Sequence, residues 1–250
     1  MVNFAETLLF SAVMGFSIYL SLPVVLHRKR DKVTTRLLVA IAIGILIFLM
    51  ADVFSDVTPT LYSTDSFYGY GSSLFYDPIF VISLAVGFLT LYYFENRSKA
   101  SLTPTQLSLI IALGIGFQNL TEGLVFGSLG VTLGFTGVTL VVLVGFTFQN
   151  LTEGFPIVSP FLGEVETRSS VLLGLFFVGG VPTVVGGAVG FYCSSTIFDV
   201  IFDGIAMGSI LYVILPMFKN LFKESGGESQ RVIYIGIFLG FMFGSLVNLI

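Results

Sequence analysis

Two glutamates stand in identical seven-residue settings within long apolar stretches of this chain. The heptapeptide FQNLTEG occupies residues 117–123 and returns at residues 148–154, so that Glu122 and Glu153 are 31 residues apart. A charged side chain deep in a bilayer costs about 2.5–3.5 kcal/mol on insertion scales. No lysine or arginine lies deep in either stretch to compensate. Protonation, a water-filled cavity or a bound cation would each explain such carboxylates.

Amide side chains accompany each glutamate. In both copies a glutamine precedes the glutamate by four residues and shares its helical face, while an asparagine lies about 100° further round the helix. If the two helices face each other, carboxylate and amide oxygens converge at one depth, which suits a divalent cation. The predicted metal ligands are Gln118, Asn119, Glu122, Gln149, Asn150 and Glu153. The alternative for the asparagines alone, and for Thr121 and Thr152, is that they join helices by hydrogen bonds.

Four further acids lie toward the outer ends of two other apolar stretches. They form two pairs with a spacing of four residues, Asp52 with Asp56 and Asp199 with Asp203, so each pair shares a helical face. We predict that they line an ion entry path. A solvated or helix-capping role is the alternative.

The composition places these residues in a membrane. Of 250 residues, 55% are hydrophobic and 10% are charged, whereas soluble domains carry about 25% charged residues. The mean hydropathy is +0.97. We therefore predict an all-α, polytopic bundle forming a single transmembrane domain over residues 1–250, in contact with a lipid bilayer and with no nucleic acid. Apolar runs of about 20 residues predict eight spans, at 8–26, 36–57, 74–94, 105–130, 135–162, 170–192, 197–218 and 232–250.

The basic residues predict the orientation of these spans. With eight spans, all eleven lysines and arginines fall in or beside alternate connections, those after the first, third, fifth and seventh spans. The positive-inside rule places these connections in the cytoplasm and both termini outside. We therefore expect a multi-pass protein of the cell membrane. The segment 58–78, which has no lysine or arginine, is expected to be an outward loop.

Glycine and proline predict local features beside the two glutamates. Gly123 and Gly154 follow them directly and would allow close approach of neighbouring backbones. Pro156 and Pro160 remove amide donors and predict a kink just cytoplasmic of Glu153. A broken helix beside a midplane site is a recurring feature of transporters.

The paired motifs resemble those of the ZIP (zinc/iron-regulated transporter-like) family of divalent metal transporters. That family carries motifs of the type H-N-x-x-[DE]-G and [HQ]-[ND]-x-x-E-G on its fourth and fifth helices, which read QNLTEG twice here. The segments GILIFLMADVFSD at 44–56, GGVPTVVGG at 179–187 and GSILYVILP at 208–216 are similar to prokaryotic and archaeal members. The resemblance implies a 3+2+3 arrangement of helices, with the metal held by the fourth and fifth and alternating access by bundles that move against each other.

The chain departs from the family pattern at several positions. Gln118 and Gln149 stand where many members have histidine, and Val181 precedes Pro182 where many have glutamate. The connection 95–103 lacks the usual histidines. Nitrogen ligands suit Zn²⁺, whereas amide and carboxylate oxygens favour harder ions such as Mn²⁺, Fe²⁺ or Mg²⁺. The resemblance therefore implies a divalent metal site without fixing the metal or whether one or two ions bind.

We predict a permease for zinc, iron or manganese, in which the metal is the transported substrate, and neither an enzyme nor a protein that needs a cofactor. The chain has no G-x-x-x-x-G-K-[ST] motif, so a gradient of metal, protons or voltage would drive transport. Three alternatives stay open: a transporter of another solute, an intramembrane enzyme using the two glutamates as acid and base, and a member without metal that acts through protein contacts. A homodimer also stays open.

Overall fold

The protein is a bundle of long helices, described here from a computed structural model over residues 3–23, 31–62, 71–97, 102–134, 137–162, 168–193, 195–223 and 227–248. No strand occurs in these ranges. Eight helical segments are long and apolar enough to cross a membrane, which confirms the all-α bundle and the number of spans. The elements are α1 Phe4–Phe16, the 3-10 helix η1 Ser17–Ser21, α3 Lys32–Leu61, α4 Gly71–Arg97, α5 Pro104–Leu133, α6 Gly137–Val158, the 3-10 helix η2 Ser159–Phe161, α7 Ser169–Tyr192, α8 Thr196–Lys223 and α9 Gly227–Asn248.

Helices suit this sequence because a helix pairs its backbone groups internally, as a bilayer requires. Side chains cap several of the helix starts. Thr103 and Gln106 form a reciprocal capping box at the start of α5. Asp31 accepts a hydrogen bond from the backbone of Thr34 at the start of α3, and bonding to Thr34 lowers the pKa of the Asp31 carboxyl.

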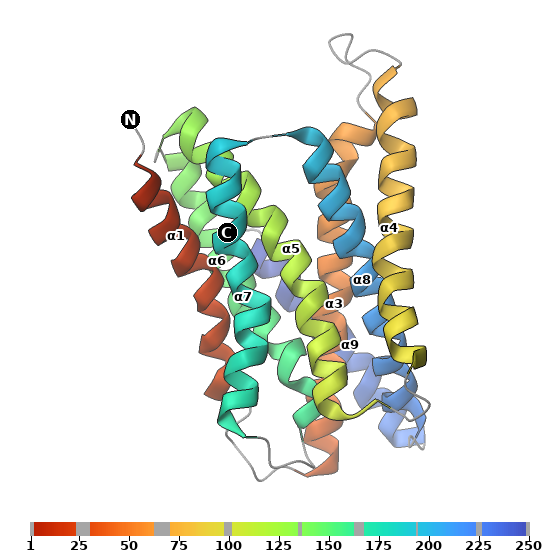
Figure 1. The fold of residues 1–250 in the computed structure, drawn as a ribbon. Helices are drawn as coiled ribbons and strands as arrows, with labels where there is room; N and C mark the ends of the chain where they lie inside the picture. The colour runs from red at the N-terminus through yellow and green to blue at the C-terminus, as the bar shows by residue number, and fades with distance from the viewer. Residues whose placement is uncertain are drawn as a thin grey trace.

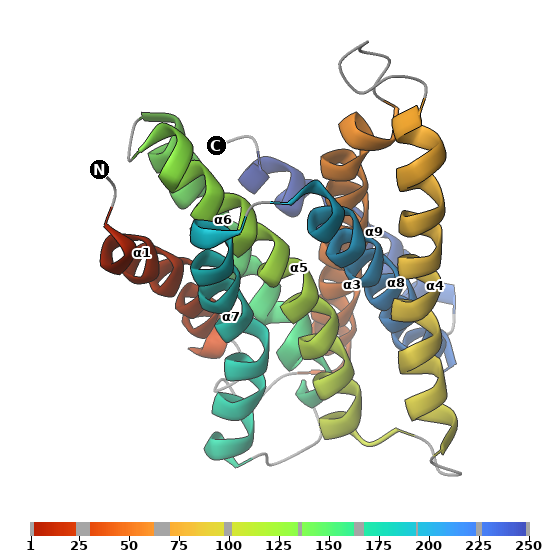
Figure 2. The same ribbon diagram turned by 45° about the horizontal axis from the view of Figure 1, so that its top comes forward.

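The helices divide into two groups. The most extensive packing joins α5 to α7, α3 to α9 and α4 to α8. α1 and α6 add to the first pair, giving a site group of α1, α5, α6 and α7. The other four, α3, α4, α8 and α9, form a support group. Figures 1 and 2 show the site group on one side and α3, α4 and α8 on the other. The two groups meet mainly where α5 packs against α8, so α5 carries its motif close to their boundary.

Close backbone contacts lie inside each group. A Cβ atom at Gly123 on α5 would overlap the carbonyl oxygen of Thr183 on α7, and one at Gly44 on α3 would overlap that of Ile237 on α9. Across the boundary, a Cβ at Gly114 would meet Ser209 at 3.4 Å, an ordinary contact. Among the glycines whose surroundings the structure describes, none contacts the other group more closely than this. The backbones are thus packed more closely within each group than at Gly114 on the boundary.

Several predicted boundaries differ from the observed ones. The outward loop expected at 58–78 is shorter, because α3 continues to Leu61 and α4 begins at Gly71. Polar and aromatic residues at a membrane interface resemble a loop in composition, yet they continue a helix started in the apolar region. The first span begins earlier than predicted, at Phe4, and its predicted end at residue 26 lies outside the described residues. The basic residues at 28–30 and 99 lie outside the described residues, so the orientation stays a prediction.

Candidate functional site

α5 and α6 bring the two motif copies together inside the site group. Thr121 and Thr152 bond to carbonyls of their own helices, which frees the amides and carboxylates to face neighbours. The predicted role of Gly154 is confirmed, since a Cβ there would lie 2.5 Å from the Ile18 carbonyl oxygen and would overlap Ser21. α6 then gives way to the 3-10 turn η2 at Ser159, so the helix is interrupted within two turns of Glu153, at the position that the prolines predicted.

All six predicted metal ligands are buried. Their exposed fractions run from 0% for Asn119, Asn150 and Glu153 to 5% for Glu122, with 3% for the two glutamines. Hydrogen bonds connect four of them directly, as described next. The structure therefore brings together the residues that the sequence pairs, including partners from opposite helices.

Glu122 accepts hydrogen bonds from three amide groups. Its Oε1 accepts from Gln149 Nε2 at 2.8 Å and from Gln118 Nε2 at 3.3 Å, and its Oε2 accepts from Asn150 Nδ2 at 3.3 Å. Two of these three donors come from α6, on the other motif copy. Hydrogen bonds to an ionised carboxylate are stronger than those between two neutral groups. These three donors therefore stabilise the charge of Glu122 without a bound ion.

Glu153 has no such support. Neither of its carboxylate oxygens has a hydrogen-bond partner, and both are buried. The amides of Asn119 and Gln149 lie beside it and interact favourably with its carboxylate, although neither contact has the geometry of a hydrogen bond. The oxygens Gln118 Oε1, Asn119 Oδ1 and Asn150 Oδ1 are also buried and unpartnered. Buried polar atoms in native structures almost always have a partner. Five unpartnered oxygens among these four side chains therefore require an explanation.

A cavity of about 310 Å³ connects the site to the acids of the predicted entry path. Gln118 and Glu122 form part of its wall. All four aspartates line the same cavity, which confirms that each pair faces a common space: Asp52 and Asp56 from α3, Asp199 and Asp203 from α8. Since α3 and α8 belong to the support group and Glu122 to the site group, the cavity lies between the groups.

Asp52 contacts a motif residue directly, which its position in the sequence did not predict. Gln149 Nε2 donates to Asp52 Oδ2 at 3.2 Å while also donating to Glu122. The spacing of Asp52 to Asp56 identified a shared face, but only the packing of α3 against α6 reveals this link.

No three acidic, histidine or cysteine side chains of the described residues are grouped as metal ligands. An ion at the motifs would therefore need the amide oxygens to complete its shell. Asn119 also has a structural role, because its Nδ2 donates to the Gly179 carbonyl of α7 at 2.9 Å. That contact joins two helices, as the alternative interpretation expected, and still leaves the Asn119 oxygen unpartnered.

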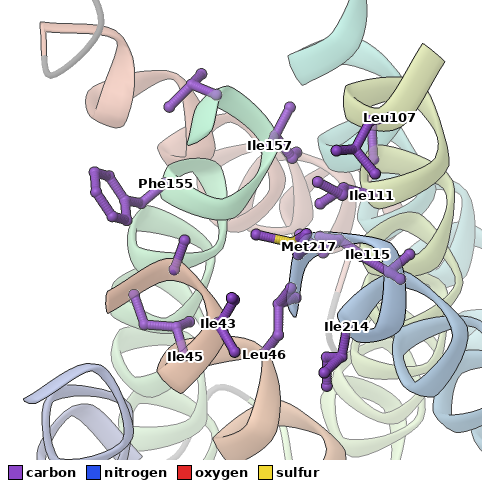
Figure 3. Packing of buried hydrophobic residues seen from close by; sticks show 14 of the residues in the cluster. Ile43, Ile45, Leu46, Leu107, Ile111, Ile115, Phe155, Ile157, Ile214 and Met217 are labelled. Carbon is purple, nitrogen blue, oxygen red and sulfur yellow. The ribbon is translucent and has the colours of Figure 1, made fainter. Parts of the chain in front are cut away.

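An apolar barrier separates the site from a second cavity. This second cavity, of about 270 Å³, is lined by residues that include Arg36, Leu107 and Met217. Leu107 precedes Gln118 by eleven residues on α5, about 16 Å along the helix. Figure 3 shows side chains of this interval, among which Ile111 and Met217 point into the space between their helices. The barrier comprises Ile43 and Leu46 of α3, Ile111 and Ile115 of α5, Ile157 of α6 and Ile214 of α8, all buried. Sequence reasoning did not find the barrier, because these residues look like any others in apolar spans.

In comparisons with known proteins, no protein-family profile matches the chain and no curated protein is significantly similar to it. The site is therefore interpreted from its own chemistry.

Proposed function

We propose that this protein transports a divalent metal cation across the cell membrane, with the ion bound between α5 and α6. The five buried, unpartnered oxygens carry this proposal. A cation would satisfy such oxygens, whereas a neutral solute would have to supply several hydrogen-bond donors. The all-oxygen ligand set favours Mn²⁺ or Fe²⁺ over Zn²⁺. Membership of the ZIP family, suggested by the two motif copies, is part of the proposal.

The acidic cavity supports a route for the ion to the site. Carboxylates lining one cavity attract cations and raise their local concentration. The cavity walls include Glu122 itself, so an ion that reaches the aspartates meets the motif next. The apolar barrier beyond the site would stop water and ions from crossing directly. The structure is thus interpreted as the conformation open to the aspartate side, which we propose is the outer side, with both termini there.

The distribution of glycine contacts supports alternating access by movement of one group against the other. Backbones approach more closely within each group, at Gly123 and Gly44, than across the boundary at Gly114, where a Cβ atom would make only ordinary contacts. Interlocked backbones move together, whereas a boundary formed by side chains can shift by exchanging rotamers. Both motif copies lie in the site group, so its movement would carry the ion from one cavity toward the other.

Uptake of Mn²⁺, Fe²⁺ and Zn²⁺ into proteoliposomes tests the proposal. We expect saturable uptake by the wild-type protein, no uptake by Glu122→Gln together with Glu153→Gln, and no competition from organic cations. A competing organic cation would favour the alternative of another solute. Equal uptake by the double variant and the wild type would contradict the proposal, once monodisperse elution shows that both are folded.

A further inference from the structure

The two glutamates have the same sequence neighbours but opposite environments. Glu122 accepts three side-chain hydrogen bonds, and Glu153 accepts none. Glu122 lies in the wall of the aspartate cavity, whereas Glu153 is 0% exposed. α5 and α6 run in opposite directions, so Gln149 on α6 lies level with Glu122, but Gln118 and Gln149 both donate to Glu122 and neither donates to Glu153. Glu153 is then one turn, about 6 Å, further along α6 toward the apolar barrier.

The hydrogen bonds to Glu122 also fix which end of each amide is free. Gln118 and Asn150 donate to Glu122 through their nitrogens, and their oxygens have no partner. Asn119 is turned the same way, because its nitrogen donates to the Gly179 carbonyl and its oxygen is unpartnered. Each of the three amides thus uses its nitrogen in a hydrogen bond and keeps its oxygen for another ligand.

We infer that Glu153, with the amide oxygens of Gln118, Asn119 and Asn150, is the primary ion-binding centre, and that Glu122 is a positioning residue. This inference rests on the proposed function and assigns unequal roles within its site. Glu153 provides the charge that neutralises the ion. Glu122 holds Gln118 and Asn150 by their nitrogens and so keeps their oxygens available as ligands. Residues that orient metal ligands in this way typically contribute about 10–100-fold to metal affinity.

Replacing each glutamate by glutamine separates the two roles. The Glu153→Gln variant would keep one carbonyl oxygen but lose the only charge at the primary centre. The Glu122→Gln variant would keep the side-chain volume, but the new amide nitrogen cannot accept a hydrogen bond. One of the neighbouring amide nitrogens would then have to turn away, and the oxygen of that amide would be lost as a ligand.

Mn²⁺ binding to the full-length protein in lipid nanodiscs, measured by electron paramagnetic resonance, tests the inference. For Glu153→Gln we expect no saturable binding, and for Glu122→Gln we expect saturable binding about 10–100-fold weaker than wild type. Infrared difference spectra provide a second measurement. The carboxylate band that shifts when Mn²⁺ is added to wild type should persist in Glu122→Gln and be absent from Glu153→Gln.

Two outcomes would overturn the inference while leaving the proposed function intact: equal loss of binding in both variants, or greater loss in Glu122→Gln. Wild-type protein that binds no Mn²⁺, Fe²⁺ or Zn²⁺ would instead contradict the proposed function itself. If Glu153→Gln does not elute as a folded species, Glu153→Asp and Glu122→Asp replace the pair. Each keeps its charge, and the expected order of affinities is the same.

Discussion

Gln149 on α6 and Asp52 on α3 are joined by a hydrogen bond across the boundary between the two helix groups, with a nitrogen-to-oxygen distance of 3.2 Å. The same nitrogen donates to Glu122 at 2.8 Å. One amide therefore links the entry cavity, the motif on α5 and the motif on α6. Movement of the site group against the support group would break the bond to Asp52 and keep the bond to Glu122.

We predict that Asp52→Asn raises the KM for Mn²⁺ uptake about tenfold. Asparagine can still accept the hydrogen bond from Gln149, so the change removes mainly a charge beside the ion path. Two unit charges a few ångströms apart at the boundary of water and protein interact by about 1–4 kcal/mol, and tenfold corresponds to about 1.4 kcal/mol. Initial rates of Mn²⁺ uptake into proteoliposomes measure the effect.

Asp199→Asn is the matched control for this change, since Asp199 lines the same cavity from α8. We expect a smaller rise in KM for Asp199→Asn. Among the described contacts, a motif amide donates a hydrogen bond to Asp52, which places the Asp52 carboxylate beside the motifs. An equal effect of both variants would show that Asp52 contributes only to the general field of the cavity.

A second prediction concerns metal selectivity. Gln118→His should increase the affinity for Zn²⁺ relative to Mn²⁺ by about tenfold, because imidazole nitrogen suits Zn²⁺ better than an amide oxygen does. Competition between the two ions for uptake measures the ratio. Gln118→Asn, which keeps an amide, is the control and should leave the ratio near that of wild type. A ratio unchanged by the histidine would contradict Gln118 as a ligand.

A third prediction concerns the contact between α5 and α7. Gly123→Ala should destabilise the folded protein by about 1–3 kcal/mol, the usual cost of overpacking, because the added methyl group would overlap the carbonyl of Thr183. Gly145→Ala on α6 is the control, since a Cβ there meets nothing within 4 Å. Thermal unfolding in detergent should show a lowered midpoint for the first variant alone. Equal midpoints would mean that the helices are less closely packed than described.

A fourth prediction concerns the apolar barrier. Ile115 is 0% exposed, and Ile115→Ser should raise the passive leak of Mn²⁺ across liposomes because a hydroxyl group admits water between the two cavities. Leu113→Ser, on the same helix at a residue that is 37% exposed, should leave the leak unchanged. A leak that rises equally in both would indicate general loosening of the bundle instead of a barrier at Ile115.

Much of this architecture could be predicted from the sequence. The long apolar runs predicted eight spans, and the repeated heptapeptide identified the two segments that α5 and α6 bring together. The prolines predicted the interruption after Glu153 because they remove backbone donors. These features depend on composition and local spacing, which are properties of single segments.

Other features depend on contacts between segments and could not be predicted in this way. Glu122 and Glu153 have identical neighbours in sequence, so no local pattern distinguishes the one with three donors from the one with none. That difference follows from the direction in which the amides turn, since Gln118, Gln149 and Asn150 all donate to Glu122. The link from Gln149 to Asp52 likewise needs the packing of α3 against α6. The sequence predicted a loop over the whole segment 58–78, although both of its ends are helical. Local composition does not reveal this, because polar interfacial residues can continue a helix.

The position of a bound ion tests the central claim most directly. Crystals of the protein grown with Mn²⁺, and measured for anomalous scattering, should show one peak within about 2.0–2.6 Å of ligand oxygens from Glu153 and the motif amides between α5 and α6. Binding of Mn²⁺ only among the aspartates of the cavity, with Glu153 still without a partner, would contradict it.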